Sequence, residues 1–129
     1  MKNQYVQFHR NLLQALQQAA AQAMPVNELS EEDQTLLSQL DLLANSKSFD
    51  EAFIATGQQA LCRIVAAYPH LAPQVPRDLF WLFGGDCLHY MPDEEISLYQ
   101  QLDELRFEAE NDNTDFDYEK QRARILGLH

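Results

Sequence analysis

The chain has 129 residues, a formal net charge of −11 at neutral pH, and a composition that is 46% hydrophobic and 22% charged. This length suits a single helical domain over residues 1–129 that buries enough apolar surface to fold without disulfides or metal ions. The apolar content excludes a disordered or collagenous chain.

Membrane, secreted and nucleic-acid-binding proteins are also unexpected. The densest apolar run, residues 79–83, is far shorter than the roughly 18 residues of a membrane span. The amino terminus leads into a glutamine-rich stretch and not into a signal-peptide core. Cys62 and Cys87 are the only cysteines, and neither sits in a Cys-x-x-Cys pair, so a disulfide framework or zinc knuckle is not expected. Few bases are present to neutralise phosphates. We therefore expect a cytoplasmic protein without a cofactor.

The composition predicts an all-α fold. Leucine, alanine and glutamine contribute 19, 14 and 14 residues, whereas valine, isoleucine and threonine together contribute 11. Good helix formers thus outnumber β-branched residues about four to one. We expect a compact bundle of five or six helices with mostly antiparallel neighbours, because the connections between them are short.

Three helices are predicted in the first half of the chain. The first spans about residues 3–23, where apolar side chains recur every three or four positions. The second begins at Ser30, which is placed to form a capping box with Asp33. Another capping box begins at Ser48 and opens a third helix, which ends before Pro69.

Three prolines between residues 69 and 76 predict an extended connector, because proline disfavours helix in the residue before it. A fourth helix is predicted to begin near Pro76 and to continue to Tyr90. It is apolar nearly all round, so we expect it to be the central element, with Trp81 in the core.

Two more helices are predicted near the carboxyl end. One starts after Pro92, with carboxylates in its first turn that suit the positive end of the helix dipole. Residues 111–113 are predicted to form a loop, and Thr114 is the expected cap of the last helix. Gly127 suits the position just after that helix.

The most unusual segment is residues 83–92, where two adjacent glycines interrupt the apolar run. Each glycine costs about 1 kcal/mol relative to alanine in a helix. Tight helix packing, a kink or a bound ligand would account for them. In a continuous helix, the side chains three and four positions apart in this segment share one face. They define a candidate ligand or partner site that consists of Gly84, Gly85, Asp86, His89, Tyr90 and Glu94.

The same segment has an alternative, catalytic or metal-binding interpretation. Asp86 and His89 have the spacing of a helical metal-ligand pair, but the sequence contains no second such pair. A metal site or enzyme pocket would therefore need His9 or Glu94 to approach in space. No catalytic residue and no metal ligand is assigned, because no local nucleophile–base pair or complete ligand set is present.

The region from Asp93 to His129 carries eleven acidic and four basic residues, and thus most of the net charge. A solvated helix face is the ordinary interpretation of such a region. The alternative is a surface that mimics nucleic acid and acts as a decoy, built on Asp103, Glu104, Glu108 and Glu110.

The stretch from Trp81 to Ile96, WLFGGDCLHYMPDEEI, resembles a small uncharacterised family of gammaproteobacterial all-helical proteins. The resemblance implies a bacterial cytoplasmic protein. It brings no known activity and no catalytic residue.

Together these patterns favour a non-enzymatic protein–protein interaction or regulatory module whose partner is another protein. An enzyme or metal-binding pocket near Asp86, His89 and Tyr90 is the alternative, and the acidic decoy is a second one. A homodimer is a further possibility, because a second copy packed at Gly84 and Gly85 would cover the wide apolar arc around Trp81. Neighbouring helices of the same chain would cover it equally well.

Overall fold

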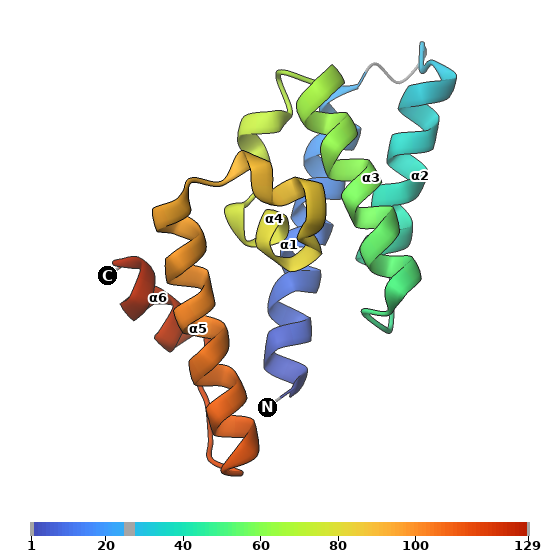
Figure 1. Cartoon of the computed structure of the whole chain (residues 1–129). Helices are drawn as coiled ribbons and strands as arrows, with labels where there is room; N and C mark the ends of the chain where they lie inside the picture. Colours follow the sequence, from blue (N-terminus) through green and yellow to red (C-terminus); the bar gives the residue numbers. More distant parts are fainter. Residues whose placement is uncertain (1, 25–27, 129) are drawn as a thin grey trace.

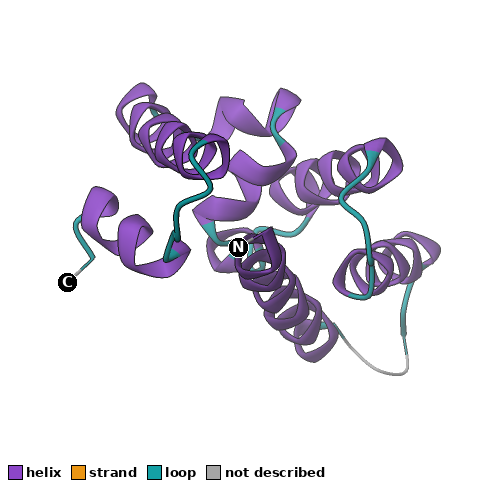
Figure 2. Cartoon of the chain, turned by 90° about the horizontal axis from the view of Figure 1, so that it is seen from below, coloured by secondary structure: helices purple, strands orange, loops and turns teal. Residues whose placement is uncertain are grey.

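The computed structural model of the chain describes residues 2–24 and 28–128, and within these residues only helices and loops occur (Figure 2). The all-α prediction is confirmed. The α-helices are α1 (Lys2–Ala23), α2 (Glu31–Ala44), α3 (Glu51–Ala67), α4 (Arg77–Phe83), α5 (Asp93–Asn111) and α6 (Tyr118–Leu126). Two short 3-10 helices flank α4, namely η1 (Ala72–Gln74) and η2 (Gly85–Tyr90).

The first three helices run in alternating directions, and α2 packs against both α1 and α3 (Figure 1). α4 lies at the middle of the molecule, where it contacts α1, α3 and η2. α5 and α6 pack on each other, and α6 also touches α1. The core is mainly leucine, and its largest fully buried apolar side chains are Leu13, Leu16, Leu36, Leu40, Leu43, Leu61, Ile64, Leu71, Leu79, Leu102 and Tyr118.

The starts of α2, α3 and α6 are set by side-chain oxygens that accept orphan backbone N–H groups. The predicted capping box of α2 is confirmed, since Asp33 N donates to Ser30 Oγ at 3.0 Å and Ser30 N donates to Asp33 Oδ2 at 3.3 Å. The prediction for α3 was wrong. Asp50, not Ser48, is its N-cap, and its carboxylate accepts from Phe53 N at 2.9 Å.

The start of α6 also differs from the prediction. Asp117 is the N-cap and accepts from Lys120 N at 3.1 Å. Thr114 instead closes the end of α5, because its backbone N–H and its hydroxyl both donate to the carbonyl of Ala109. Gly127 takes the left-handed conformation after α6, as its position predicts.

The predicted fourth helix does not continue to Tyr90. α4 ends at Phe83, and the chain then passes through Gly84 and Gly85, whose φ angles are +63° and +56°. These left-handed angles suit glycine and strain other residues, so the two glycines stop the helix and turn the chain. The connector before α4 is likewise not extended, because its residues 72–74 form η1.

Trp81 is half-buried and not at the centre of the core. Its indole Nε1 donates to Asp103 Oδ2 at 2.9 Å, and its ring stacks on that of Tyr99 with 6.1 Å between the centroids. Phe80 and Phe83 are the aromatic side chains of α4 that fill the core. The indole N–H explains this arrangement, because a buried donor needs a partner and α5 offers one.

Candidate functional site

Asp86 and His89 lie close together on η2, at the surface. His89 Nε2 is 3.9 Å from Asp86 Oδ1, and the two side chains are 80% and 89% exposed, respectively. A 3-10 helix aligns residues three apart, which explains why they meet. Such an exposed pair in high-dielectric solvent is only weakly held together.

The other predicted site residues lie elsewhere. Tyr90 turns inward, where its ring lies 5.5 Å from that of Phe80. Glu94 belongs to a hollow beside α5. His9 is buried within an aromatic cluster of α1 and α6, so it does not join His89.

A metal site is not formed by these groups. Across residues 2–24 and 28–128, no three His, Cys, Asp or Glu side chains are arranged to hold a metal ion. The described helices also include none with the length and apolar content to cross a membrane.

The hollow beside α5 combines apolar walls with charged side chains, and we call it the α4–α6 groove. It measures about 520 Å³ and is bounded by the start of α4, the first half of α5 and the end of α6. Its lining residues are Pro76, Arg77, Asp78, Pro92, Glu94, Glu95, Leu98, Tyr99, Arg122, Leu126 and Leu128. Leu128 is 52% exposed, so its apolar side chain is open to contact.

A buried ion pair forms one side of the groove. Arg122 of α6 donates two hydrogen bonds to Asp78 of α4, from Nε at 2.6 Å and from Nη2 at 2.8 Å. Asp78 is 2% exposed, so its charge depends on this partner. The hydrogen bonds to Asp78 raise the pKa of Arg122, with burial acting in the opposite sense. The bidentate geometry fixes α6 against α4.

Three further polar side chains, Arg77, Glu95 and Tyr99, line the groove. Arg77 Nε donates to Glu95 Oε1 at 2.8 Å and so links α4 to α5. Burial, followed by the nearby Asp78 carboxylate, raises the pKa of Tyr99, so its phenol stays protonated and is a hydrogen-bond donor. Both arginines of the groove are therefore already paired with carboxylates.

Behind the ion pair lies a cluster of aromatic rings around His9. The His9 ring centroid is 4.4 Å from that of Tyr5 and 5.7 Å from that of Tyr118. His9 Nδ1 donates to the carbonyl oxygen of Tyr5 at 2.7 Å. Burial lowers the pKa of His9, and it raises that of Tyr5 to about 12. These groups stay neutral near pH 7 and act as packing for α1 and α6.

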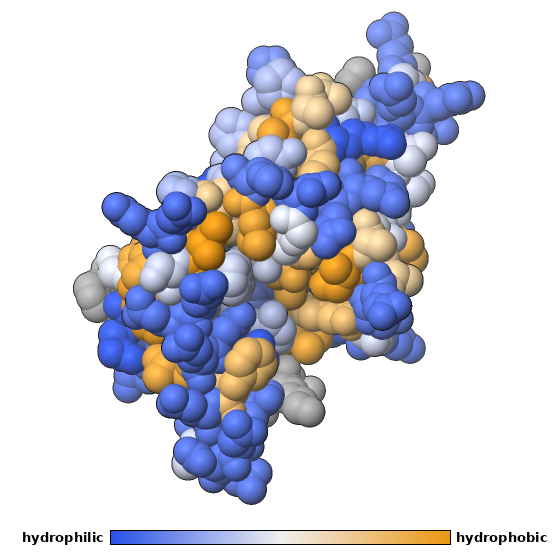
Figure 3. Space-filling view, viewed as in Figure 1, coloured by the Kyte–Doolittle hydropathy of each residue, from blue (hydrophilic) through white to orange (hydrophobic). Residues whose placement is uncertain are grey.

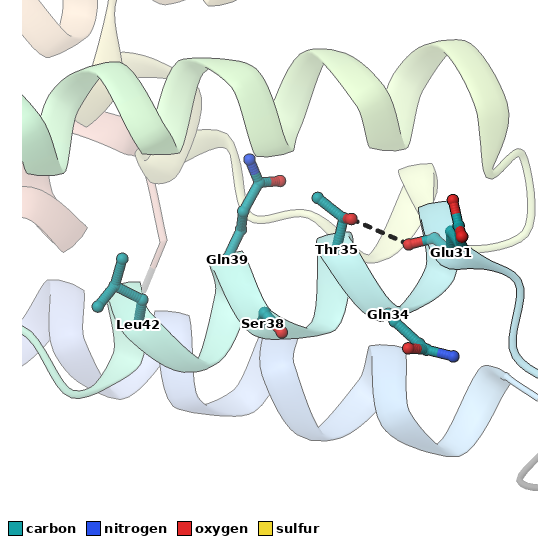
Figure 4. A pocket seen from close by; sticks show the side chains of 6 residues that line it. All are labelled: Glu31, Gln34, Thr35, Ser38, Gln39 and Leu42. Atoms are coloured by element: carbon teal, nitrogen blue, oxygen red, sulfur yellow. Dashed lines mark hydrogen bonds between the residues drawn. The ribbon is translucent and has the colours of Figure 1, made fainter.

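A second hollow, on α2, has a different character. All six of its lining side chains come from that one helix (Figure 4). Thr35 donates to the carbonyl oxygen of Glu31 at 2.9 Å, while Gln34 and Gln39 point to opposite sides. No groups from different elements converge there, so the hollow offers a ligand no enclosing arrangement.

The acidic face of α5 contains one basic residue, Arg106. Arg106 lies 3.6 Å from Asp103 and 3.9 Å from Glu110, and its guanidinium stacks on the Tyr5 ring at 3.9 Å. In Figure 3 polar side chains cover much of the end of the molecule where α5 terminates, with apolar areas between them. The acidic row is thus partly neutralised, which is unfavourable for mimicry of a continuous phosphate row.

Sequence patterns did not reveal the groove. Asp78 and Arg122 are 44 positions apart and form no local motif. One signal was present, because Arg122 falls in the apolar register of the last helix, between Tyr118 and Ile125. A charged residue in such a register indicates a buried partner.

The fold and its groove define a small all-α domain with a surface hollow formed by three helices. The chain belongs to the PA2817-like family, whose model matches residues 1–129. No curated protein and no solved structure matches the chain.

Proposed function

We propose that this chain is a non-enzymatic interaction module that binds a segment of another protein in the α4–α6 groove. The observation that carries the proposal is the groove itself, in which exposed and half-buried leucines stand beside charged side chains. Apolar anchors with a polar rim are typical of protein interfaces. The free thiols of Cys62 and Cys87 support a setting in a reducing compartment such as the cytoplasm.

The charges of the groove favour a basic partner. Arg77 and Arg122 are engaged by Glu95 and Asp78, whereas Glu94 is exposed and has no ion pair among the described residues. The net charge of −11 adds a long-range attraction for cations. The expected occupant is therefore a segment with one or two large apolar side chains next to lysine or arginine.

The test uses two exposed leucines as a matched pair. Leu128 lines the groove and is 52% exposed, and Leu42 lies on α2 and is 63% exposed. A photo-crosslinking amino acid at Leu98, in cells that express the chain, identifies the partner. Its affinity is then measured for Leu128→Asp and Leu42→Asp. We expect Leu128→Asp to weaken binding about tenfold or more, and Leu42→Asp to leave it unchanged.

A charge-reversal variant at Glu94 tests the same proposal independently. Glu94→Lys should slow association with a basic partner, most clearly at low salt. Equal loss in both leucine variants, or a partner segment without basic residues, would contradict the proposal. A crosslink to a second copy of this chain, with a mass of twice 14.9 kDa by light scattering, would show that the groove is a homodimer interface instead.

A further inference from the structure

The two cysteines of the chain lie on elements that pack directly against each other. α3 contacts η2, and Gln58 of α3 donates a hydrogen bond from Nε2 to the carbonyl oxygen of Phe83 at 2.8 Å. A Cβ atom added at Gly85 would lie 2.6 Å from the same Nε2 atom. The glycine turn is therefore held tightly on the face of α3 that carries Gln58.

This packing makes Cys62 and Cys87 neighbours. Cys62 lies one helical turn after Gln58 on α3, and Cys87 lies two residues after Gly85 on η2. Cys62 and Cys87 are neighbouring groups there, and the Tyr90 side chain lies beside the same pair. Both thiols are free, but only Cys62 reaches solvent, because Cys87 is fully buried. A half-buried cysteine and a fully buried one are thus neighbours where α3 packs on η2.

We propose that Cys62 and Cys87 form a reversible modification site at which hydrogen peroxide converts the thiol pair into an intramolecular disulfide. The site lies outside the α4–α6 groove, and the inference does not depend on the proposed function. Disulfides of this kind in a reducing compartment are usually transient and redox-sensing.

The reaction begins at Cys62, because its sulfur is the accessible one. This sulfur attacks one peroxide oxygen, the O–O bond breaks, and Cys62 becomes a sulfenic acid as one water leaves. The sulfur of Cys87 then attacks the sulfur of Cys62, the S–O bond breaks, and a second water leaves. Two thiols are oxidised by two electrons in total, and one hydrogen peroxide is reduced to two waters.

The surroundings of Cys87 make the second step the slower one. Burial, followed by the adjacent Cys62, raises the pKa of the Cys87 thiol to about 12. Since the thiolate is the attacking form, little of it is present near pH 7. We therefore expect the sulfenic acid at Cys62 to accumulate before the disulfide closes, and closure to quicken as the pH rises.

The experiment treats the folded full-length chain with hydrogen peroxide and maps its peptides without reduction. We expect a linked peptide pair that contains Cys62 and Cys87, an intact mass lower by two hydrogen atoms, and reversal by dithiothreitol. The rate should not depend on protein concentration, because the reaction is intramolecular. Dimedone added early should label Cys62 and prevent the link.

Two serine variants assign the roles. Cys87→Ser should stop at a dimedone-reactive Cys62, and Cys62→Ser should leave Cys87 unmodified at the same peroxide dose, with circular dichroism confirming the fold. If a variant does not fold, the peptide map of the unaltered chain still decides. Links between two chains, equally fast oxidation of Cys87 in Cys62→Ser, or over-oxidation of Cys62 without any link would overturn the proposal.

Discussion

Removal of Arg122 tests the role of the buried ion pair. Arg122→Met keeps much of the side-chain volume but leaves the Asp78 carboxylate, 2% exposed, without its bidentate partner. Breaking one side of a buried pair costs about 3–5 kcal/mol. A chain of 129 residues has an unfolding entropy of about 0.27 kcal/mol/K, so the expected fall in Tm is about 11–18 °C.

The assay is urea unfolding of a double-mutant cycle. Asp78→Asn should cost less than Arg122→Met, because the Arg122 side chain is 22% exposed and water can solvate the freed guanidinium. The double variant Asp78→Asn/Arg122→Met should be more stable than Arg122→Met alone, because it leaves no buried carboxylate without a charged partner. A cost below about 1 kcal/mol for Arg122→Met, or a double variant less stable than Arg122→Met, would refute this reasoning.

Three smaller perturbations have equally defined outcomes. Gly127→Ala should cost about 1 kcal/mol from its left-handed φ of +72° alone. Gly85→Ala should cost more, because its Cβ would lie 2.6 Å from Gln58 Nε2 and would displace that amide from its hydrogen bond to the carbonyl oxygen of Phe83. Thermal unfolding ranks the two variants. Burial lowers the pKa of His9, so the unfolded chain takes up its proton first, and stability should fall as the pH drops below about 6.5. His9→Gln should flatten that slope in urea titrations between pH 7 and 5. The Tyr68 hydroxyl donates to Asp33 Oδ1 at 2.7 Å and lowers the pKa of that carboxyl, so in Tyr68→Phe an NMR titration should find the pKa of Asp33 moved upward.

Local signals predicted the helices well and their exact starts less well. The prediction chose Ser48 and Thr114 as caps, and the structure uses Asp50 and Asp117. Each aspartate follows its predicted cap by two or three residues, and both residue types are good N-caps. A charged carboxylate is the stronger acceptor for an orphan N–H, and it also suits the positive end of the helix dipole. Apolar spacing alone does not distinguish between such neighbours.

The end of the fourth helix could not be predicted from local apolar periodicity, because it depends on a contact with α3. Apolar residues continue through Gly84 and Gly85, so periodicity predicts one long helix. The structure ends the helix there, and Gln58 from α3 binds the carbonyl oxygen of Phe83 that would otherwise have lost its helical partner. Nothing in the sequence near the glycines identifies Gln58, which lies 25 positions earlier than Phe83. The predicted site assumed a continuous helix from Gly84 to Tyr90. Because the helix ends at Phe83, the residues of that site lie on separate surfaces.

The groove and the cysteine pair depend on different contacts, which makes their properties separable by experiment. The groove depends on the position of α6, which is held by the buried ring of Tyr118 and by the bond from Arg122 to Asp78 at the start of α4. The cysteines depend on α3 and on the turn that follows α4. Arg122→Met should thus weaken partner binding, at temperatures where it remains folded, and leave peroxide-driven linkage intact. Cys87→Ser should abolish the peroxide-driven linkage and leave partner binding unchanged. If both variants impaired both properties, the two sites would be coupled, and the bond from Arg77 to the carbonyl oxygen of Tyr90 is a contact that joins them.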